Sequence, residues 1–390
     1  MSPRLLPLAA AALLSVACSG NHDGGGAAGT GGSGGTGGSG GTGGSGGAAG
    51  AGGAAGTGGQ SAECAALGQK LQAALDQARQ STGSRDAALA VTTESCGTNA
   101  FVSGESKLTG SELFRIGSVT KTYVSAVVLR LVGAGKLSLD DKLDAWVSGV
   151  PNGSAITVRM LLNHTSGIFN YTQDPSFLSD LTKAWTPDEL VKLAASHGAV
   201  NAPGTKWDYS NTNYVCLGII AEKVGGGPIA QQIRAELLAP NQLEHTFFDG
   251  GEKLGGTLAP GFAKDGTDST HALHPSGPWA AGAMTATAAD TARWIELYAT
   301  GKAVPPAQQT EMEKGEAVGP NVTYGLGLMM LDAAITGGAG KAFGHNGSIN
   351  GYHTQAFHFR DSKTTIVSIV NQDGADPNDV TLAALTTLFP

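Results

Sequence analysis

The 390-residue sequence has no cluster of basic residues and no recognisable metal motif, and only 6% of its residues are aromatic. Its formal net charge is −8, so a nucleic acid is not an expected partner. The nine histidines are scattered without a His-Glu-x-x-His pattern, and no two cysteines have the spacing of a zinc site. We therefore expect a protein that works without a metal or another cofactor.

Cysteine is also scarce, with four residues in the chain. Cys216 lies in an apolar run, where a buried thiol is expected. Cys64 and Cys96 flank the first expected helix and strand of the body, and an exported protein can join them in a disulfide. The sequence leaves the connectivity open, and the pair of Cys64 with Cys96 is the one that we expect.

The N-terminal segment has the pattern of an export signal at residues 1–17. Arg4 supplies its positive charge, and the apolar run at residues 5–14 is too short to cross a bilayer. The residues before Cys18 resemble a bacterial lipoprotein signal, although Ser15 stands where such signals prefer leucine. We expect export and a lipid on Cys18, which would anchor the protein to a membrane and face it toward the periplasm or the cell surface. The alternative is an ordinary secretory peptide that leaves Cys18 unmodified.

Glycine is abundant but unevenly distributed, since 22 of the 60 glycines fall in the 36 residues 24–59. A Gly-rich chain of this length is flexible, with a typical end-to-end distance of roughly 30–36 Å. We expect residues 18–60 to be a linker and residues 61–390 to be the folded body. The linker would tether the body to the lipid anchor.

Strand patterns occupy both ends of the body, and helical patterns lie between them. The expected strands are residues 87–93, 100–103, 113–116, 322–331, 341–345, 352–359 and 364–370, with turns at 96–99, 337–338, 346–347 and 361–362. The expected helices are residues 61–81, 118–133, 158–162, 187–195, 213–224, 229–238, 288–300 and 379–388. We infer an α+β fold in which both chain ends build one antiparallel sheet. It would have a sheet lobe (about 61–117 and 288–390) and an inserted helical lobe (about 118–287).

Ser118 and Lys121 form a Ser-x-x-Lys pattern where an extended segment enters the helix expected at residues 118–133. Three residues apart on a helix, the two side chains share a face. A serine hydroxyl needs a neighbouring base to become a nucleophile, and a lysine can be that base. The pattern also occurs by chance, and a serine at a helix start is often only an N-cap.

Tyr209 and Asn211 lie in a polar loop that enters an apolar helix. A phenol near cations can lose its proton well below its usual pKa of about 10, so Tyr209 could take a proton from Ser118. Asn211 could orient a substrate amide. The alternative interpretation is a plain helix N-terminus, with Ser210 or Asn211 as its cap.

Residues 345–348 read His-Asn-Gly-Ser on a strand that we expect at the edge of the sheet. Gly347 would let a ligand approach the backbone, and an N–H group of this strand could join that of Ser118 in holding a developing oxyanion. Asn-Gly is also a strong turn signal, so a plain hairpin is the alternative. His164, elsewhere in the chain, is expected to brace its own loop.

In this order, Ser-x-x-Lys, Tyr-x-Asn and His-x-Gly resemble the three motifs of the penicillin-recognising serine enzymes. Over roughly residues 62–390 the chain resembles the class C β-lactamase group, and within it the secreted D-alanyl-D-alanine carboxypeptidases. The resemblance is carried by residues 114–143, 156–167, 203–217, 279–284, 324–327 and 344–357. It implies a β-lactamase/transpeptidase-like fold and a hydrolase that forms an acyl-enzyme.

The resemblance also implies catalytic roles for matching residues. Ser118 would be the acylated nucleophile, and Lys121 and Tyr209 would share the work of general base and general acid. His345, where many relatives have lysine, would help to position Tyr209 and the substrate. The backbone N–H groups of Ser118 and Ser348 would form the oxyanion hole.

Two further residues would bind the substrate if the resemblance holds: Asn211 would contact the substrate amide and Trp279 would line the cleft. One feature departs from the carboxypeptidases. They place an arginine after a Gly-Leu-Gly-Leu strand, where it binds the terminal carboxylate of the substrate, whereas this chain has Met329 and Met330. Asn346 also stands where a threonine is common.

We therefore expect an exported serine hydrolase that acts on a small peptide, an ester or a β-lactam. A D-alanyl-D-alanine carboxypeptidase-like or related peptidase is the leading interpretation, and the missing arginine argues against strict carboxypeptidase specificity. An esterase and a class C-like β-lactamase are alternatives on the same scaffold. A non-catalytic cell-wall binding protein is a third, against which the retention of all the motif residues argues.

Overall fold

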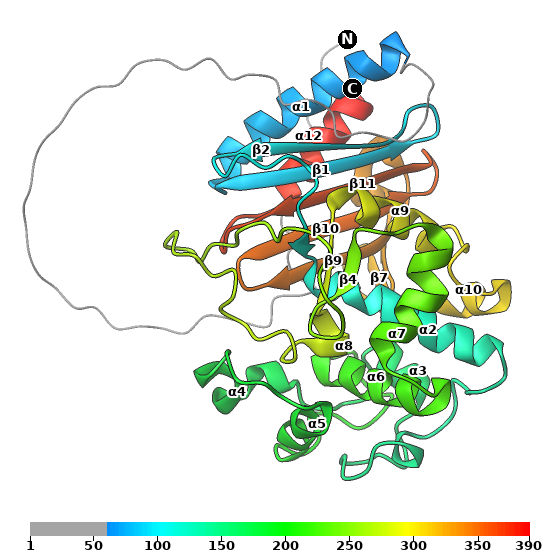
Figure 1. Cartoon of the computed structure of the whole chain (residues 1–390). Helices are drawn as coiled ribbons and strands as arrows, with labels where there is room; N and C mark the ends of the chain where they lie inside the picture. Colours follow the sequence, from blue (N-terminus) through cyan, green and yellow to red (C-terminus); the bar gives the residue numbers. More distant parts are fainter. Residues whose placement is uncertain (1–60) are drawn as a thin grey trace, which may run out of the picture.

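Both ends of the described chain contribute to one antiparallel sheet of eight strands (Figure 1). The computed structural model describes residues 61–390, so the signal expected at residues 1–17, Cys18 and the linker expected at residues 18–60 lie outside the described residues. The strand order is β2-β1-β11-β10-β9-β8-β7-β6. The strands are β1 (Asp86–Thr93), β2 (Gly97–Gly104), β6 (Glu316–Gly319), β7 (Val322–Tyr324), β8 (Met329–Leu331), β9 (Ala342–Ile349), β10 (Tyr352–Phe359) and β11 (Thr364–Val370). The predicted α+β fold is confirmed.

The two chain ends meet where β1 pairs with β11, with Ala87 opposite Val370. Both strands are buried along almost their whole length, because helices cover both faces of the sheet. Helices α1 (Ala62–Thr82) and α12 (Asn378–Leu388) pack together on one face, and α9 (Ala288–Ala299) packs on the other (Figure 1). The sheet is therefore the middle layer of three.

A disulfide joins Cys64 in the first turn of α1 to Cys96 in the connection between β1 and β2, as the sequence predicted. It ties the outer helix to the edge of the sheet. Cys216 is a free thiol in α6 (Asn211–Gly225), and burial raises its pKa to about 12. A thiol in this state is a packing element rather than a reactive group.

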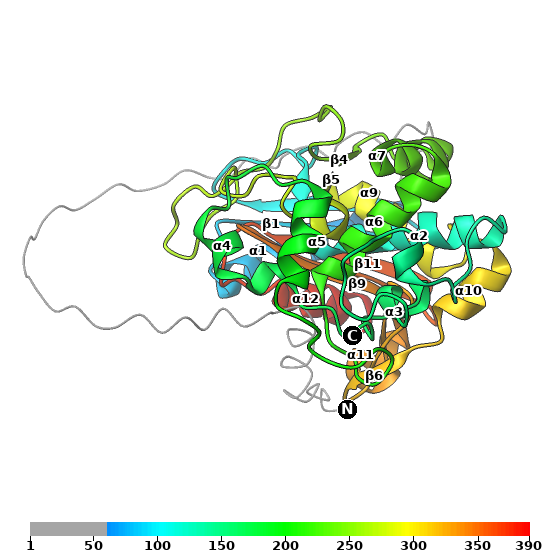
Figure 2. The same ribbon diagram turned by 90° about the horizontal axis from the view of Figure 1, so that it is seen from below.

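The helices between β3 and β5 lie below the main sheet in Figure 1 and, for α3, α5 and α6, in front of it in Figure 2. Besides α6, they are α2 (Thr120–Gly133), α3 (Val158–Leu162), α4 (Pro175–Ser179), α5 (Pro187–Ala195), α7 (Ile229–Ile233) and α8 (Trp279–Gly282). Two short helices, α10 (Pro306–Met312) and α11 (Ala333–Thr336), belong to the C-terminal part of the chain. Within residues 61–390, no helix combines the length and the apolar character needed to cross a bilayer.

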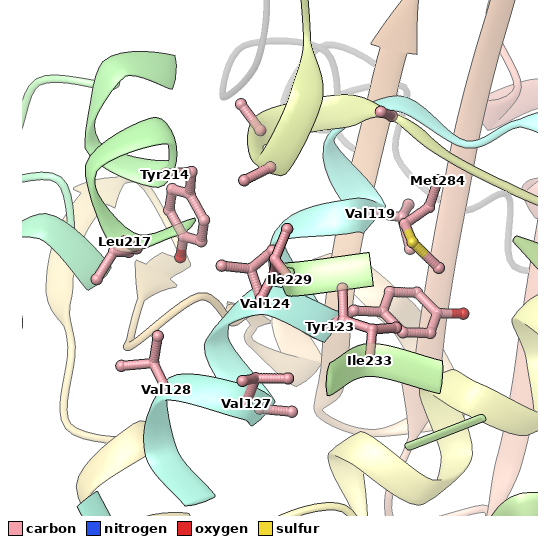
Figure 3. Packing of buried hydrophobic residues seen from close by; sticks show 14 of the residues in the cluster. Val119, Tyr123, Val124, Val127, Val128, Tyr214, Leu217, Ile229, Ile233 and Met284 are labelled. Carbon is pink, nitrogen blue, oxygen red and sulfur yellow. The ribbon is translucent and has the colours of Figure 1, made fainter. Parts of the chain in front are cut away.

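Helix α2 is the centre of this helical part and is buried from Thr120 to Leu129. Figure 3 shows its valines, among them Val124 and Val128, facing Tyr214 of α6 and Ile229 of α7. Each fully buried apolar side chain of this size contributes about 1.5–3 kcal/mol to folding. A helix enclosed in this way can hold the residues at its N-terminus in fixed positions.

A second sheet of three short strands was not predicted from the sequence. It consists of β3 (Phe114–Arg115), β4 (Thr246–Phe248) and β5 (Met284–Ala286) in the order β3-β5-β4. Strands of two or three residues are too short to produce an alternating pattern. The sheet matters for the site because β3 leads directly into Ser118, and the Ile116 N–H donates to the Met284 carbonyl at 3.1 Å.

The strand expected at residues 322–331 is wrong, because the chain reverses within it. Strands β7 and β8 pair with each other around a tight turn in which the Gly325 N–H donates to the Leu328 carbonyl at 2.7 Å. The turn expected at residues 96–99 starts earlier, at residue 94, because β2 already begins at Gly97.

The turn expected at residues 346–347 is also wrong. Strand β9 continues through these residues to Ile349 and pairs with β10 along its whole length. The reversal falls instead at residues 350–351. Strand β9 lies between β8 and β10 rather than at the edge of the sheet, although its pairing with β8 ends at Gly344. The second half of β9 is therefore open on the side that faces Ser118.

The disulfide leads to a prediction about stability. Replacing both Cys64 and Cys96 by alanine should lower the free energy of unfolding by about 2–4 kcal/mol, because the cross-link restricts the unfolded chain. Chemical denaturation measures the change, and wild-type protein in reducing buffer is the control that should show the same loss. Equal stability of the variant and the oxidised wild type would contradict the prediction.

Candidate active site

Ser118 lies in a single turn of 3₁₀ helix, Gly117–Val119, between β3 and α2. Helix α2 begins at Thr120, two residues later than expected. Gly117 has a φ of +51°, which favours glycine, and the Thr120 hydroxyl donates to its carbonyl at 2.6 Å. The Ser118 side chain makes no capping bond, so the N-cap interpretation does not hold. The hydroxyl is left for other contacts.

Lys121 is completely buried and points at Ser118. Its Nζ donates to Ser118 Oγ at 2.9 Å, to Asn211 Oδ1 at 2.8 Å and to the Ala281 carbonyl at 2.7 Å. An ammonium group has three hydrogens, and here each one has an acceptor. The buried cation is thus compensated by hydrogen bonds that it donates to the Ser118 turn, α6 and α8.

Tyr209 approaches the same serine from the loop that precedes α6. Its hydroxyl donates to Ser118 Oγ at 2.8 Å, and Lys121 Nζ lies 4.9 Å from the centre of its ring. The nearby ammonium stabilises the phenolate form of such a group. Ser118 Oγ therefore contacts both groups that can exchange a proton with it.

The alternative interpretation of the Tyr209 loop, a simple capped helix, is not what the structure contains. Ser210 occupies the N-cap position of α6 but its side chain makes no capping bond. Asn211 uses Oδ1 to accept from Lys121 and Nδ2 to donate to Thr172 Oγ1 at 3.3 Å. Its amide is therefore part of the polar network around the lysine.

The second half of β9 lies directly against the Ser118 turn. A Cβ atom built on Gly347 would lie 2.0 Å from the Ile116 carbonyl oxygen and 3.1 Å from Ser118 N. A Cβ atom built on Gly117 would lie 2.9 Å from Ser348 N. The two backbones can touch because both positions are glycine. The backbone nitrogens of Ser118 and Ser348 both lie at this contact.

Trp279 begins α8 and packs its ring on α6, where a Cβ atom built on Gly218 would lie 2.7 Å from the ring. The same helix supplies the Ala281 carbonyl to Lys121. Trp279 is therefore adjacent to the polar cluster through α8, and its ring packs on α6.

His345 lies behind the cluster rather than on a surface that a substrate could reach, since it is fully buried. Its Nε2 lies 2.9 Å from the hydroxyl of Tyr324, and its Nδ1 contacts the Asn346 carbonyl. The Tyr324 hydroxyl also lies 3.2 Å from Nε2 of His164. The sequence analysis missed Tyr324, because only the pairing of β7 to β8 and β8 to β9 places it beside His345.

Both histidines are held in the neutral form. Burial, and then the charge of Lys121, lower the pKa of His345 to about 3 from its ordinary value of 6.5. The same two causes hold the pKa of His164 well below that value, with a smaller contribution from His345. Lys121 is therefore the charged member of this group, and the imidazoles around it are not.

The position of the missing arginine is occupied by apolar side chains. Met329 is fully buried in β8, and Met330 packs against the hydrophobic core on the opposite face of the strand. Neither can bind a carboxylate. Within residues 61–390, no three His, Cys, Asp or Glu side chains gather where they could hold a metal ion.

Comparison with known proteins agrees with this arrangement. The family model described as Beta-lactamase matches residues 71–388, which include all the residues of the cluster. The chain belongs to the Beta-lactamase family. Members of this family are serine hydrolases, and they include penicillin-binding proteins and amidases.

Two solved structures are similar over almost the whole described body. One is a D-stereospecific amidohydrolase from Streptomyces sp., with 32% identity, a TM-score of 0.72, and coverage of 82% of this chain and 98% of that one. The other is a D-amino acid amidase from Ochrobactrum anthropi SV3, with 27% identity, a TM-score of 0.74, and coverage of 83% and 100%.

Among curated sequences, the putative penicillin-binding protein PbpX of Bacillus subtilis (strain 168) is 29% identical over 225 residues. The match covers 57% of this chain and 55% of PbpX, so the chain spans little more than half of the length of this relative.

The buried histidines lead to a prediction about acid stability. His345 takes a proton in the unfolded chain near pH 6.5 but not in the folded protein until about pH 3. The free energy of unfolding should therefore fall as the pH drops through this range, by up to about 1.4 kcal/mol per pH unit for this one group. Denaturation from pH 7 to pH 4 should show a shallower fall for His345→Asn than for wild type. The control His271→Asn, at an exposed position, should keep the wild-type slope, and an unchanged slope in His345→Asn would contradict the account.

Proposed function

We propose that the protein is a serine hydrolase that forms an acyl-enzyme on Ser118 and cleaves the amide bond of a D-amino acid residue. The observation that carries the proposal is the position of Ser118 Oγ, 2.9 Å from Lys121 Nζ and 2.8 Å from the Tyr209 hydroxyl. A serine placed between two groups that can carry protons has what nucleophilic catalysis requires.

In the proposed acylation step, Tyr209 acts as the phenolate, the form that the neighbouring Lys121 ammonium stabilises. The phenolate takes the proton of Ser118 Oγ as this oxygen attacks the carbonyl carbon. The electron pair of the carbonyl π bond moves to the oxygen, where the backbone N–H groups of Ser118 and Ser348 would hold the negative charge. Collapse of this intermediate re-forms the carbonyl and breaks the C–N bond, and Tyr209 returns the proton to the departing amine.

In deacylation, water takes the place of the amine and the same groups work in reverse. Tyr209, which became a phenolate again when it protonated the amine, accepts a proton from the attacking water, and the oxyanion forms in the same place. Breakage of the ester then returns the proton to Ser118 Oγ. One set of residues thus serves both halves of the reaction.

Two observations favour an amide substrate without a terminal carboxylate. Met329 and Met330 stand where the carboxypeptidases that the chain resembles carry an arginine, so the site lacks that anchor for a carboxylate. The structures that match over nearly their full length have the names of a D-stereospecific amidohydrolase and a D-amino acid amidase. D-alanyl-D-alanine carboxypeptidase, esterase and β-lactamase activities are the rivals that the assay must separate.

We also propose that the enzyme works outside the cytoplasm. The pattern of residues 1–17 supports export, a lipid on Cys18 would provide the anchor, and residues 18–60 would be the tether. This placement gives the enzyme access to peptides and amides that contain D-amino acids at the cell surface.

The proposal predicts the behaviour of a serine variant. Ser118→Ala should reduce the hydrolysis of D-phenylalanine amide by at least about 1000-fold, because the nucleophile is removed. The matched control is Ser125→Ala in α2, which removes a buried hydroxyl that donates to the Leu326 carbonyl. Release of ammonia measures the turnover of D- and L-phenylalanine amide by both variants. Separation of substrate from product by liquid chromatography measures the turnover of alanyl dipeptides of D configuration, an ester and a penicillin.

Each outcome of this assay has a clear meaning. Faster turnover of the D-amide than of every competitor supports the amidase. Preference for the D,D-dipeptide, the ester or the penicillin would replace the amidase by the corresponding activity on the same serine. Full activity in Ser118→Ala would contradict the assignment of the nucleophile.

A further inference from the structure

The hydroxyl of Tyr324 joins two buried imidazoles. It lies 2.9 Å from Nε2 of His345 on β9 and 3.2 Å from Nε2 of His164, in the loop that follows α3. All three side chains are fully buried. This pair of contacts links the sheet to the helical part of the molecule directly behind the candidate catalytic residues.

The chain of hydrogen bonds has only one possible direction. The Ser210 N–H can only donate, so Nδ1 of His164 accepts from it at 3.3 Å, and Nε2 of the same ring must carry the hydrogen. At the other end, the Asn346 carbonyl can only accept, so Nδ1 of His345 donates and its Nε2 accepts. The Tyr324 hydroxyl therefore accepts from His164 and donates to His345.

Each end of this chain is next to a candidate catalytic group. Ser210 follows Tyr209, whose ring lies on the ring of His164 with centroids 4.3 Å apart. Asn346 precedes Gly347 and Ser348, which form the part of β9 that touches the Ser118 turn. The series of hydrogen bonds thus runs from the loop that carries Tyr209 to the strand that carries the proposed oxyanion-hole donor, Ser348 N–H.

We propose that Tyr324 is a positioning residue whose hydroxyl, through His164 and His345, fixes the Tyr209 loop at the distance from β9 that catalysis requires. This inference rests on the proposed acyl-enzyme function of Ser118. Catalysis by proton transfer and oxyanion binding depends on placement within about 0.5 Å. The buried, uncharged side chains of His164, Tyr324 and His345 link the Tyr209 loop to β9 by hydrogen bonds of one fixed direction. This link provides that precision.

The resemblance implied that His345 helps to position both Tyr209 and the substrate. In this proposal His345 acts on the Tyr209 loop through Tyr324 and His164, and it does not act on the substrate from β9. The low pKa of both imidazoles supports the arrangement, because each ring must stay neutral to accept at one nitrogen and donate at the other.

The test is the Tyr324→Phe variant of the full chain, assayed with p-nitrophenyl acetate. This ester needs only the nucleophile, the proton-carrying groups and the oxyanion hole. We expect kcat to fall about 10- to 100-fold, because displacement of a catalytic group by a fraction of an ångström slows both half-reactions. KM should stay within about twofold, because binding of this small ester does not depend on the link.

A matched control separates this role from simple packing. Tyr298→Phe removes an equally buried hydroxyl, one that donates to the carbonyls of Leu326 and Gly327. It should keep kcat within about twofold of wild type even if both variants lose similar stability in thermal denaturation.

The pH profile gives a readout that a purely structural role would not change. In Tyr324→Phe, Nε2 of His345 loses its donor, so the neutral imidazole loses support and is protonated more easily. The acidic limb of kcat/KM should move to higher pH by about half a unit or more. The ionisable groups that face His345 are Lys121 from α2, His164 from the loop after α3, and Tyr324 itself from β7.

A double-mutant cycle completes the experiment. His345→Leu breaks the same link, so combining it with Tyr324→Phe should reduce kcat no further than the larger single effect. Multiplication of the two effects would show independent contributions and overturn the proposal. A kcat and a pH profile of Tyr324→Phe equal to those of Tyr298→Phe would overturn it as well.

Failure of the proposed function would look different. In that case Ser118→Ala would turn over the ester as fast as wild type, and the positioning role would fall with it. If turnover of the ester is lost in Ser118→Ala but unchanged in Tyr324→Phe, the proposed function stays in place and only the positioning role is rejected.

Discussion

The structure depends on the contact between two backbones, the turn that carries Ser118 and the second half of β9. Gly117 and Gly347 permit this contact, since a methyl group at Gly347 would lie 2.0 Å from a carbonyl oxygen of the facing segment. It sets the position of Ser118 Oγ relative to the neighbouring backbone N–H groups. The contact joins two parts of the fold, because β9 belongs to the eight-stranded sheet and the turn follows β3 of the three-stranded sheet.

Lys121 imposes the second constraint. A charge in the interior is costly unless it is fully hydrogen-bonded, and its acceptors come from Ser118, Asn211 and Ala281, which are distant in sequence. Helices α2, α6 and α8 must therefore pack in one arrangement for the cation to be buried. Figure 3 shows the apolar side of the same packing, where side chains of α2, α6 and α7 meet. The imidazoles of His164 and His345 behind the lysine stay neutral, so no second positive charge repels the ammonium group.

The sequence predicted the local parts of this picture and missed those that depend on distant pairing. The spacing of Ser118 and Lys121 anticipated their contact because it follows from helix geometry alone. The Asn346–Gly347 pair misled, since its turn preference is overridden by the continuous pairing of β9 with β10. The three-stranded sheet and the place of Tyr324 beside His345 arise from segments far apart in the chain, for which a single sequence carries no signal.

The central claim is that Ser118 becomes covalently acylated. The most direct measurement is the intact mass of the protein, quenched in acid during turnover of a D-phenylalanine ester, followed by peptide mapping. The account predicts a gain of one D-phenylalanyl group on the peptide that contains Ser118, and no gain in Ser118→Ala. An adduct that persists in Ser118→Ala, or turnover by the wild type without any adduct, would contradict it.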